Sequence, residues 1–121
     1  MSGREFSQAV TEKAGNLPGD GYRIVNAVAD LTVEDSISDA SIVISFDRNG
    51  SPFNYTDAKL KDFELKPGNN SVWFSSTVPS DLNDADEMKV YIWNPLKEIF
   101  SVTRLEVKVT LEDYPYDRFI R

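Results

Sequence analysis

Apolar and polar residues alternate along the central part of the chain. In the stretch 23–33 every second residue from position 25 to position 33 is apolar, and most residues between them are polar. The stretch 40–47 repeats the pattern, with Ser41, Ser45 and Asp47 at the intervening positions. Successive side chains of a β-strand point to opposite faces, so this period of two predicts strands with one buried face. We expect Ser41, Ser45 and Asp47 to face solvent.

Three segments in the C-terminal half, 71–78, 87–94 and 100–111, alternate in the same way. In the last of them the apolar positions change parity after Val102, which predicts a β-bulge near Thr103 and Arg104. Asn49-Gly50 predicts a type I′ hairpin turn, because both central residues of that turn need a positive φ. The cluster at 66–70 predicts another turn. Residues 7–14 fit either two helical turns or a strand.

About seven strands spaced roughly 10–15 residues apart predict an all-β fold, a two-layer antiparallel β-sandwich. The length of 121 residues fits a single domain over 1–121, either complete or excised from a larger protein. Residues 112–121 include Pro115, which ends the last strand, with Tyr114 before it and Tyr116 and Phe119 after it. This is more apolar surface than a flexible tag carries. We expect a C-terminal tail that docks on a sheet face or on another chain.

Composition narrows the chemistry. The chain has no Cys and no His, which excludes disulfides, thiol nucleophiles, imidazole bases and Cys- or His-ligated metals. Its net charge of −7 disfavours nucleic acid as a partner, and no apolar run approaches the roughly 20 residues of a transmembrane helix. The acidic stretch Asp81, Asp84, Asp86 and Glu87 offers carboxylates for Ca²⁺ but lacks the order of an EF-hand loop. We expect a solvated turn there and no cofactor; the alternative is a structural Ca²⁺, which no motif supports.

Residues 86–95, with the sequence DEMKVYIWNP, carry a family resemblance. Together with the strand that ends at Val109, they resemble the C-terminal half of bacterial jelly-roll domains of the carbohydrate-binding-module, galactose-binding-like type. The stretches 22–25, 41–49 and 63–68 follow the order of such domains. The resemblance implies a jelly-roll binding or accessory domain in an extracytoplasmic or cell-surface protein. Where such domains usually carry an Asp pair in the last strand, this chain has Thr103-Arg104, so no carboxylate role is carried over.

Three aromatic residues form the candidate binding site. By parity, Trp73, Tyr91 and Trp93 lie on the face opposite the apolar positions of their strands. Flat aromatic rings stack on the C–H faces of sugars, and indole offers the largest rigid platform. If the segments 71–78 and 87–94 are neighbours in one sheet, the three rings form a patch for a glycan. The alternative is that they pack under a loop, under the tail or against each other.

These observations favour a non-catalytic binding or accessory domain that recognises carbohydrate through exposed aromatic residues. The alternative is a structural or protein–protein interaction module of a larger surface or membrane protein. We do not expect an enzyme. Glycoside hydrolysis needs a pair of carboxylates in a cleft, and a sandwich of this length has little room for a deep active site.

Overall fold

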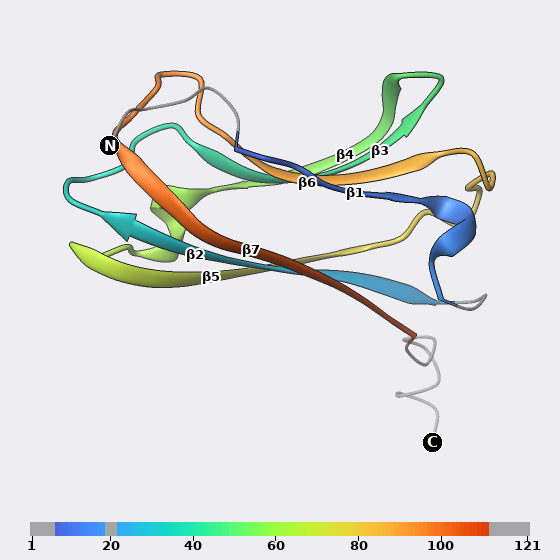
Figure 1. Ribbon diagram of the computed structural model, residues 1–121, viewed down its shortest axis with the longest axis horizontal. Coiled ribbons are helices and arrows are strands. Elements are labelled where there is room, and N and C mark those ends of the chain that lie inside the picture. Colours follow the sequence, from blue (N-terminus) through green and yellow to red (C-terminus); the bar gives the residue numbers. More distant parts are fainter. Residues whose placement is uncertain (1–6, 19–21, 112–121) are drawn as a thin grey trace.

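Two antiparallel sheets pack face to face in the computed structural model of the chain, which describes residues 7–18 and 22–111 (Figure 1). The expected tail at 112–121 lies outside the described residues. The first sheet has the order β1-β6-β3-β4, with β1 (Val10–Lys13), β6 (Glu87–Trp93), β3 (Ser41–Arg48) and β4 (Ser51–Lys59). The second has the order β5-β2-β7, with β5 (Gly68–Thr77), β2 (Arg23–Val33) and β7 (Phe100–Leu111). The prediction of an all-β, two-layer antiparallel sandwich is confirmed.

The described residues include two short 3₁₀ segments, Ala14–Asn16 and Leu60–Phe63. Neither they nor any other described helix is long and apolar enough to cross a membrane. The first segment follows β1, so the N-terminal stretch that fitted either a helix or a strand contains a strand. The second connects β4 to β5 and therefore links the two sheets.

The core lies between the central strands of the two layers. All five inward-facing residues of β2 are buried, as the alternation predicts: Val25, Ala27, Ala29, Leu31 and Val33. They meet Ala40 and the inward-facing apolar residues of β3 and β6, which are Ile42, Ile44, Phe46, Met88, Val90 and Ile92. Burying such side chains is the dominant favourable contribution to folding.

The outer face of β3 does not match the sequence prediction. Ser41, Ser45 and Asp47 were expected to face solvent, but all three are buried, and so is Val43 between them. The cause is the position of β3 between β4 and β6, whose larger side chains flank its outer face. The cross-strand neighbours of Ser41 and Val43 in β6 are Trp93 and Tyr91. Small side chains at a central strand are covered by large ones on either side.

Asp47 is a buried carboxylate with two partners. It accepts a hydrogen bond of 2.7 Å from the Ser45 hydroxyl. It also forms an ion pair with Lys89, whose Nζ lies 3.0 Å from Asp47 Oδ2. Because buried charges need partners, this pairing makes the burial of Asp47 tolerable. The hydrogen bond that Lys89 donates to Asp47, followed by the charge of Asp47, raises the pKa of Lys89.

The predicted turn and bulge are both present. Asn49 and Gly50 have φ values of 54° and 80° and join β3 to β4 as a two-residue turn between Arg48 and Ser51. In β7, Arg104 pairs with Asp30 while Val102 pairs with the next residue of β2, Leu31. Thr103 is therefore the extra residue of a bulge. This bulge produces the change in apolar parity along β7.

The acidic stretch before β6 contains a buried carboxylate, Asp86, paired with the partly exposed Arg48, rather than a fully solvated turn. Asp86 is buried and accepts hydrogen bonds from Arg48 Nε at 3.0 Å, Arg48 Nη2 at 2.8 Å and the Asn83 amide at 2.8 Å. The Arg48 hydrogen bond, followed by the Asn83 amide and the charge of Arg48, lowers the Asp86 pKa against the opposing effect of burial. No group of three or more His, Cys, Asp or Glu among the described residues could hold a metal ion.

Glu98 ties together two loops at one end of the sandwich. Its carboxylate accepts hydrogen bonds from the Ser38 amide and hydroxyl at 2.7 and 2.9 Å, and from the Asp39 and Ala40 amides at 3.2 and 3.3 Å. Asn94 closes the other side of the loop through hydrogen bonds with the backbone of Glu98. The connection between β6 and β7 is thereby joined to the connection between β2 and β3.

We expect Glu98→Gln to destabilise the protein by roughly 1 kcal/mol at neutral pH, because an amide accepts fewer and weaker hydrogen bonds than a carboxylate. Burial on its own raises the pKa of Glu98, but the hydrogen bonds from Ser38, Asp39 and Ala40 outweigh it and lower the pKa. A lowered pKa in the folded state gives stability above the unfolded-state pKa that is lost as pH falls through the folded-state pKa. Urea unfolding at about pH 7 and about pH 3 is therefore expected to show a deficit at neutral pH that shrinks in acid. An equal deficit at both pH values contradicts this role.

Candidate functional site

The three aromatic residues of the candidate site lie on different faces of the sandwich. Trp73 is in β5 of the three-stranded sheet, whereas Tyr91 and Trp93 are in β6 of the four-stranded sheet. The two strands belong to separate layers, and all three side chains are on the outer faces, away from the core between the layers. The condition for a common patch, that the two segments be neighbours in one sheet, is not met.

Tyr91 and Trp93 are half-buried on the outer face of the four-stranded sheet. Burial, followed by the charge of Asp47, raises the pKa of the Tyr91 hydroxyl. The indole Nε1 of Trp93 is buried without a hydrogen-bond partner. These two rings cover β3, and they offer a ligand less free ring surface than Trp73 does.

Trp73 is the most exposed of the large apolar side chains among the described residues, at 69%. Its strand is at the edge of its sheet and pairs with β2. In the register of the sheet, Trp73 lies across from Val28 of β2, which in turn lies across from Glu106 of β7. The adjacent row across the same face is Ser75, Asn26 and Lys108.

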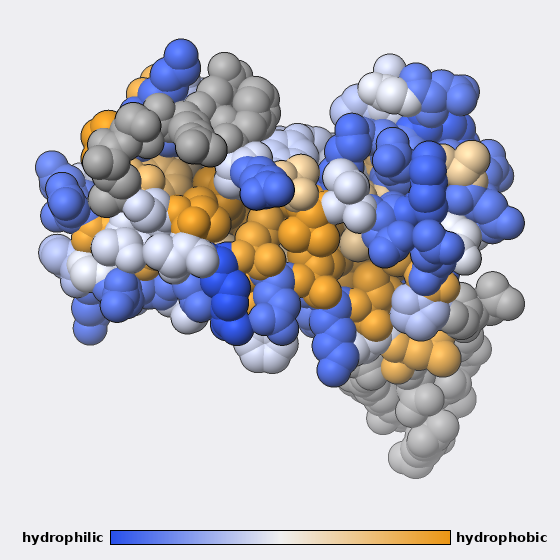
Figure 2. Space-filling view, in the orientation of Figure 1, coloured by the Kyte–Doolittle hydropathy of each residue, from blue (hydrophilic) through white to orange (hydrophobic). Residues whose placement is uncertain are grey.

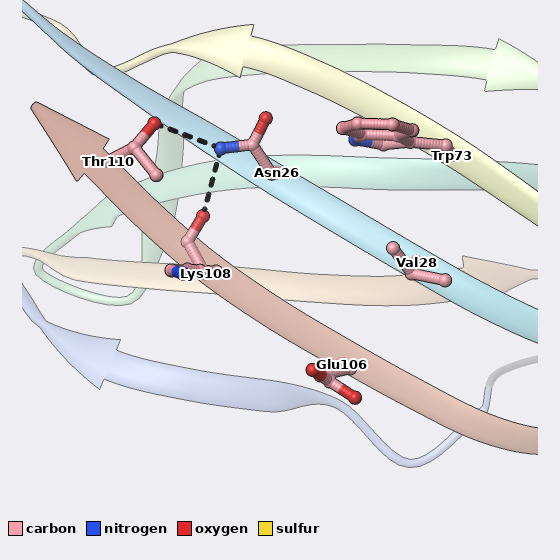
Figure 3. Close-up of a pocket in the computed structure, with 6 residues that line it drawn as sticks. All are labelled: Asn26, Val28, Trp73, Glu106, Lys108 and Thr110. Atoms are coloured by element: carbon pink, nitrogen blue, oxygen red, sulfur yellow. Dashed lines mark hydrogen bonds between the residues drawn. The ribbon is translucent and has the colours of Figure 1, made fainter. Parts of the chain in front are cut away.

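These rows border a hollow of about 330 Å³ on the outer face of the three-stranded sheet (Figure 3). It is lined by Asn26, Val28, Trp73, Glu106, Lys108 and Thr110, which come from all three strands. Figure 3 shows the Trp73 ring at the β5 side and the side chains of β7 at the other. Val28 between them provides an apolar floor. We call this surface the Trp73 face.

Asn26 is held in one orientation at the centre of the Trp73 face. Its Nδ2 donates to Thr110 Oγ1 at 3.1 Å and to the backbone oxygen of Lys108 at 3.3 Å, as drawn in Figure 3. Its Oδ1 accepts a hydrogen bond of 2.8 Å from the Ser75 hydroxyl. One amide thus connects side chains on β5 and β7, which fixes the polar wall of the hollow.

The charges on this face are balanced and linked. Arg104 pairs with Asp30 at 2.8 Å and with Glu106 at 3.0 Å, and Asp30 also accepts a hydrogen bond of 2.6 Å from Ser71. The Ser71 hydrogen bond, followed by the charge of Arg104, lowers the pKa of Asp30 against desolvation. With Lys108, the face carries two acidic and two basic side chains. It is therefore neutral on a chain whose net charge is −7.

No known protein family, curated protein or solved structure matches this chain. The structure bears out one part of the resemblance to jelly-roll binding domains: the chain is an all-β domain of two antiparallel sheets. What the Trp73 face does has to be argued from its own geometry.

The polar partners of Trp73 were not identified as site residues from the sequence. Alternation already places Asn26, Glu106 and Lys108 on outward-facing positions, but it does not say which strands are neighbours. The pairing of β2 with both β5 and β7 is what brings these side chains beside Trp73. The sequence alone shows only that these side chains occupy outward-facing positions in their own strands.

Proposed function

We propose that this protein is a non-catalytic carbohydrate-binding domain and that its binding surface is the Trp73 face. The observation that carries the proposal is the 69% exposed indole beside polar side chains, one of which, Asn26, is held by hydrogen bonds. An exposed tryptophan of this size has an unfavourable contact with water that a ligand can remove. A rigid aromatic surface next to fixed polar groups is the usual composition of a small-molecule site.

Recognition combines stacking with hydrogen bonds. The apolar face of a pyranose ring stacks on the Trp73 indole, and Val28 lies beside it as apolar floor. Hydroxyl groups of the sugar can reach the Glu106 carboxylate, the Lys108 ammonium and the Thr110 hydroxyl, which line the same hollow. Because the charges of the face sum to zero, the proposed ligand is a neutral glycan.

A binding role fits this hollow better than a catalytic one. Glycosidases place two carboxylates on either side of the scissile bond. Among the residues that line the hollow, Glu106 is the one carboxylate, and Arg104 is bound to it. An open face that a chain can lie across also matches binding to a polysaccharide rather than enclosure of a small substrate.

The resemblance at residues 86–95 adds support of a weaker kind. We propose on that basis that the domain is a jelly-roll-like accessory module of an extracytoplasmic or cell-surface protein. The described part of the chain has seven strands, arranged four and three. A jelly roll has eight, so the family assignment stays a proposal.

A glycan array and affinity electrophoresis through polysaccharide gels test the proposal. We expect retention by at least one neutral glycan, with a Kd of about 0.1–1 mM because the open face covers only part of the ligand. The proposal fails if no neutral glycan is retained, or if retention is restricted to polyanions and disappears at moderate salt.

A protein-interaction module is the second candidate, and an apolar band favours it. Figure 2 shows apolar side chains between the two layers, on the side along which β1 and β7 run. The inward-facing residues Val102, Leu105, Val107 and Val109 of β7 are only partly buried. The edge strand on that side of the other sheet, β1, has 4 residues against 12 in β7. A negative glycan screen would make this candidate the leading one.

A further inference from the structure

The edge strand β5 lacks the features that normally prevent an edge from pairing with another chain. An exposed edge is usually short, charged, bulged or interrupted by proline. β1 has 4 residues, β4 contains Pro52 and a register shift, and β7 contains a bulge and three charged residues. β5 has ten residues, and its sequence GNNSVWFSST contains no charge and no proline.

The sequence of β5 is also nearly symmetric about Trp73. Val72 and Phe74 flank the tryptophan, Ser71 and Ser75 come next, and the two positions beyond these on each side, 69–70 and 76–77, are polar and uncharged. A two-fold symmetric contact needs the same surface to be complementary to itself. For two antiparallel strands centred on one residue, this requires each position to match the one equally far on the other side.

We infer that β5 pairs with β5 of a second copy of this chain, antiparallel and centred on Trp73. Trp73 then faces Trp73 of the second copy, which forms an aromatic cross-strand pair, and Ser71 faces Ser75 of the second copy. On the inner face, Val72 meets Phe74 of the second copy. Phe74 is only partly buried in one chain, and the pairing gives it a further apolar neighbour. The two three-stranded sheets become one sheet of six strands.

Charge also favours a second copy at this strand. Two chains of net charge −7 repel each other over most of their surfaces, and like charges placed opposite each other are destabilising. Along β5 there are ten residues without charge, and the adjacent outer face of the sheet is neutral. The pairing leaves both indoles on the same outer face, so the dimer presents two Trp73 faces on one continuous sheet. The inference does not depend on the proposed function.

The dimer is expected to be weak. A standard protein interface uses roughly 20–30 residues from each side, and the symmetric part of β5 has about nine. We therefore expect a Kd in the micromolar range or above. Sedimentation velocity from about 5 µM to about 1 mM should show a monomer that converts reversibly to a dimer.

Charge substitutions test the register of the pairing. Ser71→Lys/Ser75→Lys places lysine opposite lysine in the dimer, and Ser71→Glu/Ser75→Glu places glutamate opposite glutamate. We expect each variant to be monomeric and an equimolar mixture of the two to associate again, because each lysine then faces a glutamate. Gln8→Lys/Thr11→Lys, near or in the edge strand β1, adds the same charge as a control and should leave the dimer intact.

Circular dichroism melting establishes that each variant is folded. If the variants at 71 and 75 do not fold, Asn69→Lys/Thr77→Lys makes the same test at the ends of the strand, where these two positions face each other across the pair. The inference is overturned if the wild-type chain is monomeric over the whole concentration range. It is also overturned if the folded lysine variant associates like the wild type, or if the mixture of lysine and glutamate variants stays monomeric.

Discussion

Trp73→Ala is expected to weaken binding of the neutral glycan by about 30-fold or more, the effect typical of removing an aromatic residue at the centre of a binding surface. The substitution removes the stacking platform but no core contact, because the indole is 69% exposed. The free energy of unfolding should therefore stay within about 0.5 kcal/mol of the wild-type value. Isothermal titration calorimetry gives the affinity, and urea unfolding gives the stability.

Tyr55→Ala is the matched control for this variant. Tyr55 is another exposed aromatic residue, at 46%, but it is in β4 of the opposite sheet. Its removal should leave glycan affinity unchanged. Equal loss of affinity in the two variants would mean that binding is not localised on the Trp73 face, and unchanged affinity in Trp73→Ala would contradict its role as a platform.

Phe46→Ala is expected to lower the free energy of unfolding by about 3–5 kcal/mol, a large part of the stability of a small domain. The Phe46 ring is 1% exposed and lies in the core between the two sheets, so its removal leaves a cavity. Phe53, in the adjacent strand β4, is 37% exposed and has the Arg48 guanidinium 4.2 Å from its ring centre. Such an exposed cation–π contact is worth about 0.5–1 kcal/mol.

Phe53→Ala is therefore the control for Phe46→Ala, and it should cost about 1 kcal/mol. Urea unfolding followed by circular dichroism measures both values under the same conditions. Similar losses in the two variants would mean that β3 does not pack into the core as described.

The sequence predicted the fold well where one strand face is apolar and the other polar. In β2, alternation identified all five buried residues because the outer face of that strand is solvated in part. The Asn49-Gly50 turn and the bulge at Thr103 were also predicted correctly. Each has a local cause, a pair of residues that accept positive φ and a change of apolar parity.

The errors occurred where the environment of a residue is set by distant segments. Ser41, Ser45 and Asp47 alternate like exposed residues, but side chains of β4 and β6 cover them. Asp86 belongs to an acidic stretch, but Arg48, which is 38 residues earlier, pairs with it and allows its burial. Polarity along the chain does not reveal such partners.

Of the residues that line the Trp73 face, the sequence pointed to Trp73 alone as a site residue. Parity placed Trp73, Tyr91 and Trp93 on outward-facing positions, and it did not show that their strands belong to different sheets. The side chains next to Trp73 come from β2 and β7, and the order of strands in a sheet is set by the packing of the whole domain.

The most direct test of the Trp73 face uses the two tryptophans of the chain, since each lies on a different outer face of the sandwich. In a ¹H–¹⁵N spectrum each indole N–H gives its own signal, which can be followed during titration with the glycan that the array identifies. Our account predicts that the Trp73 signal shifts progressively and saturates while the Trp93 signal stays in place. A shift of the Trp93 signal with Trp73 unchanged, or no shift of either signal at about 10 mM ligand, a concentration well above the expected Kd, would contradict it.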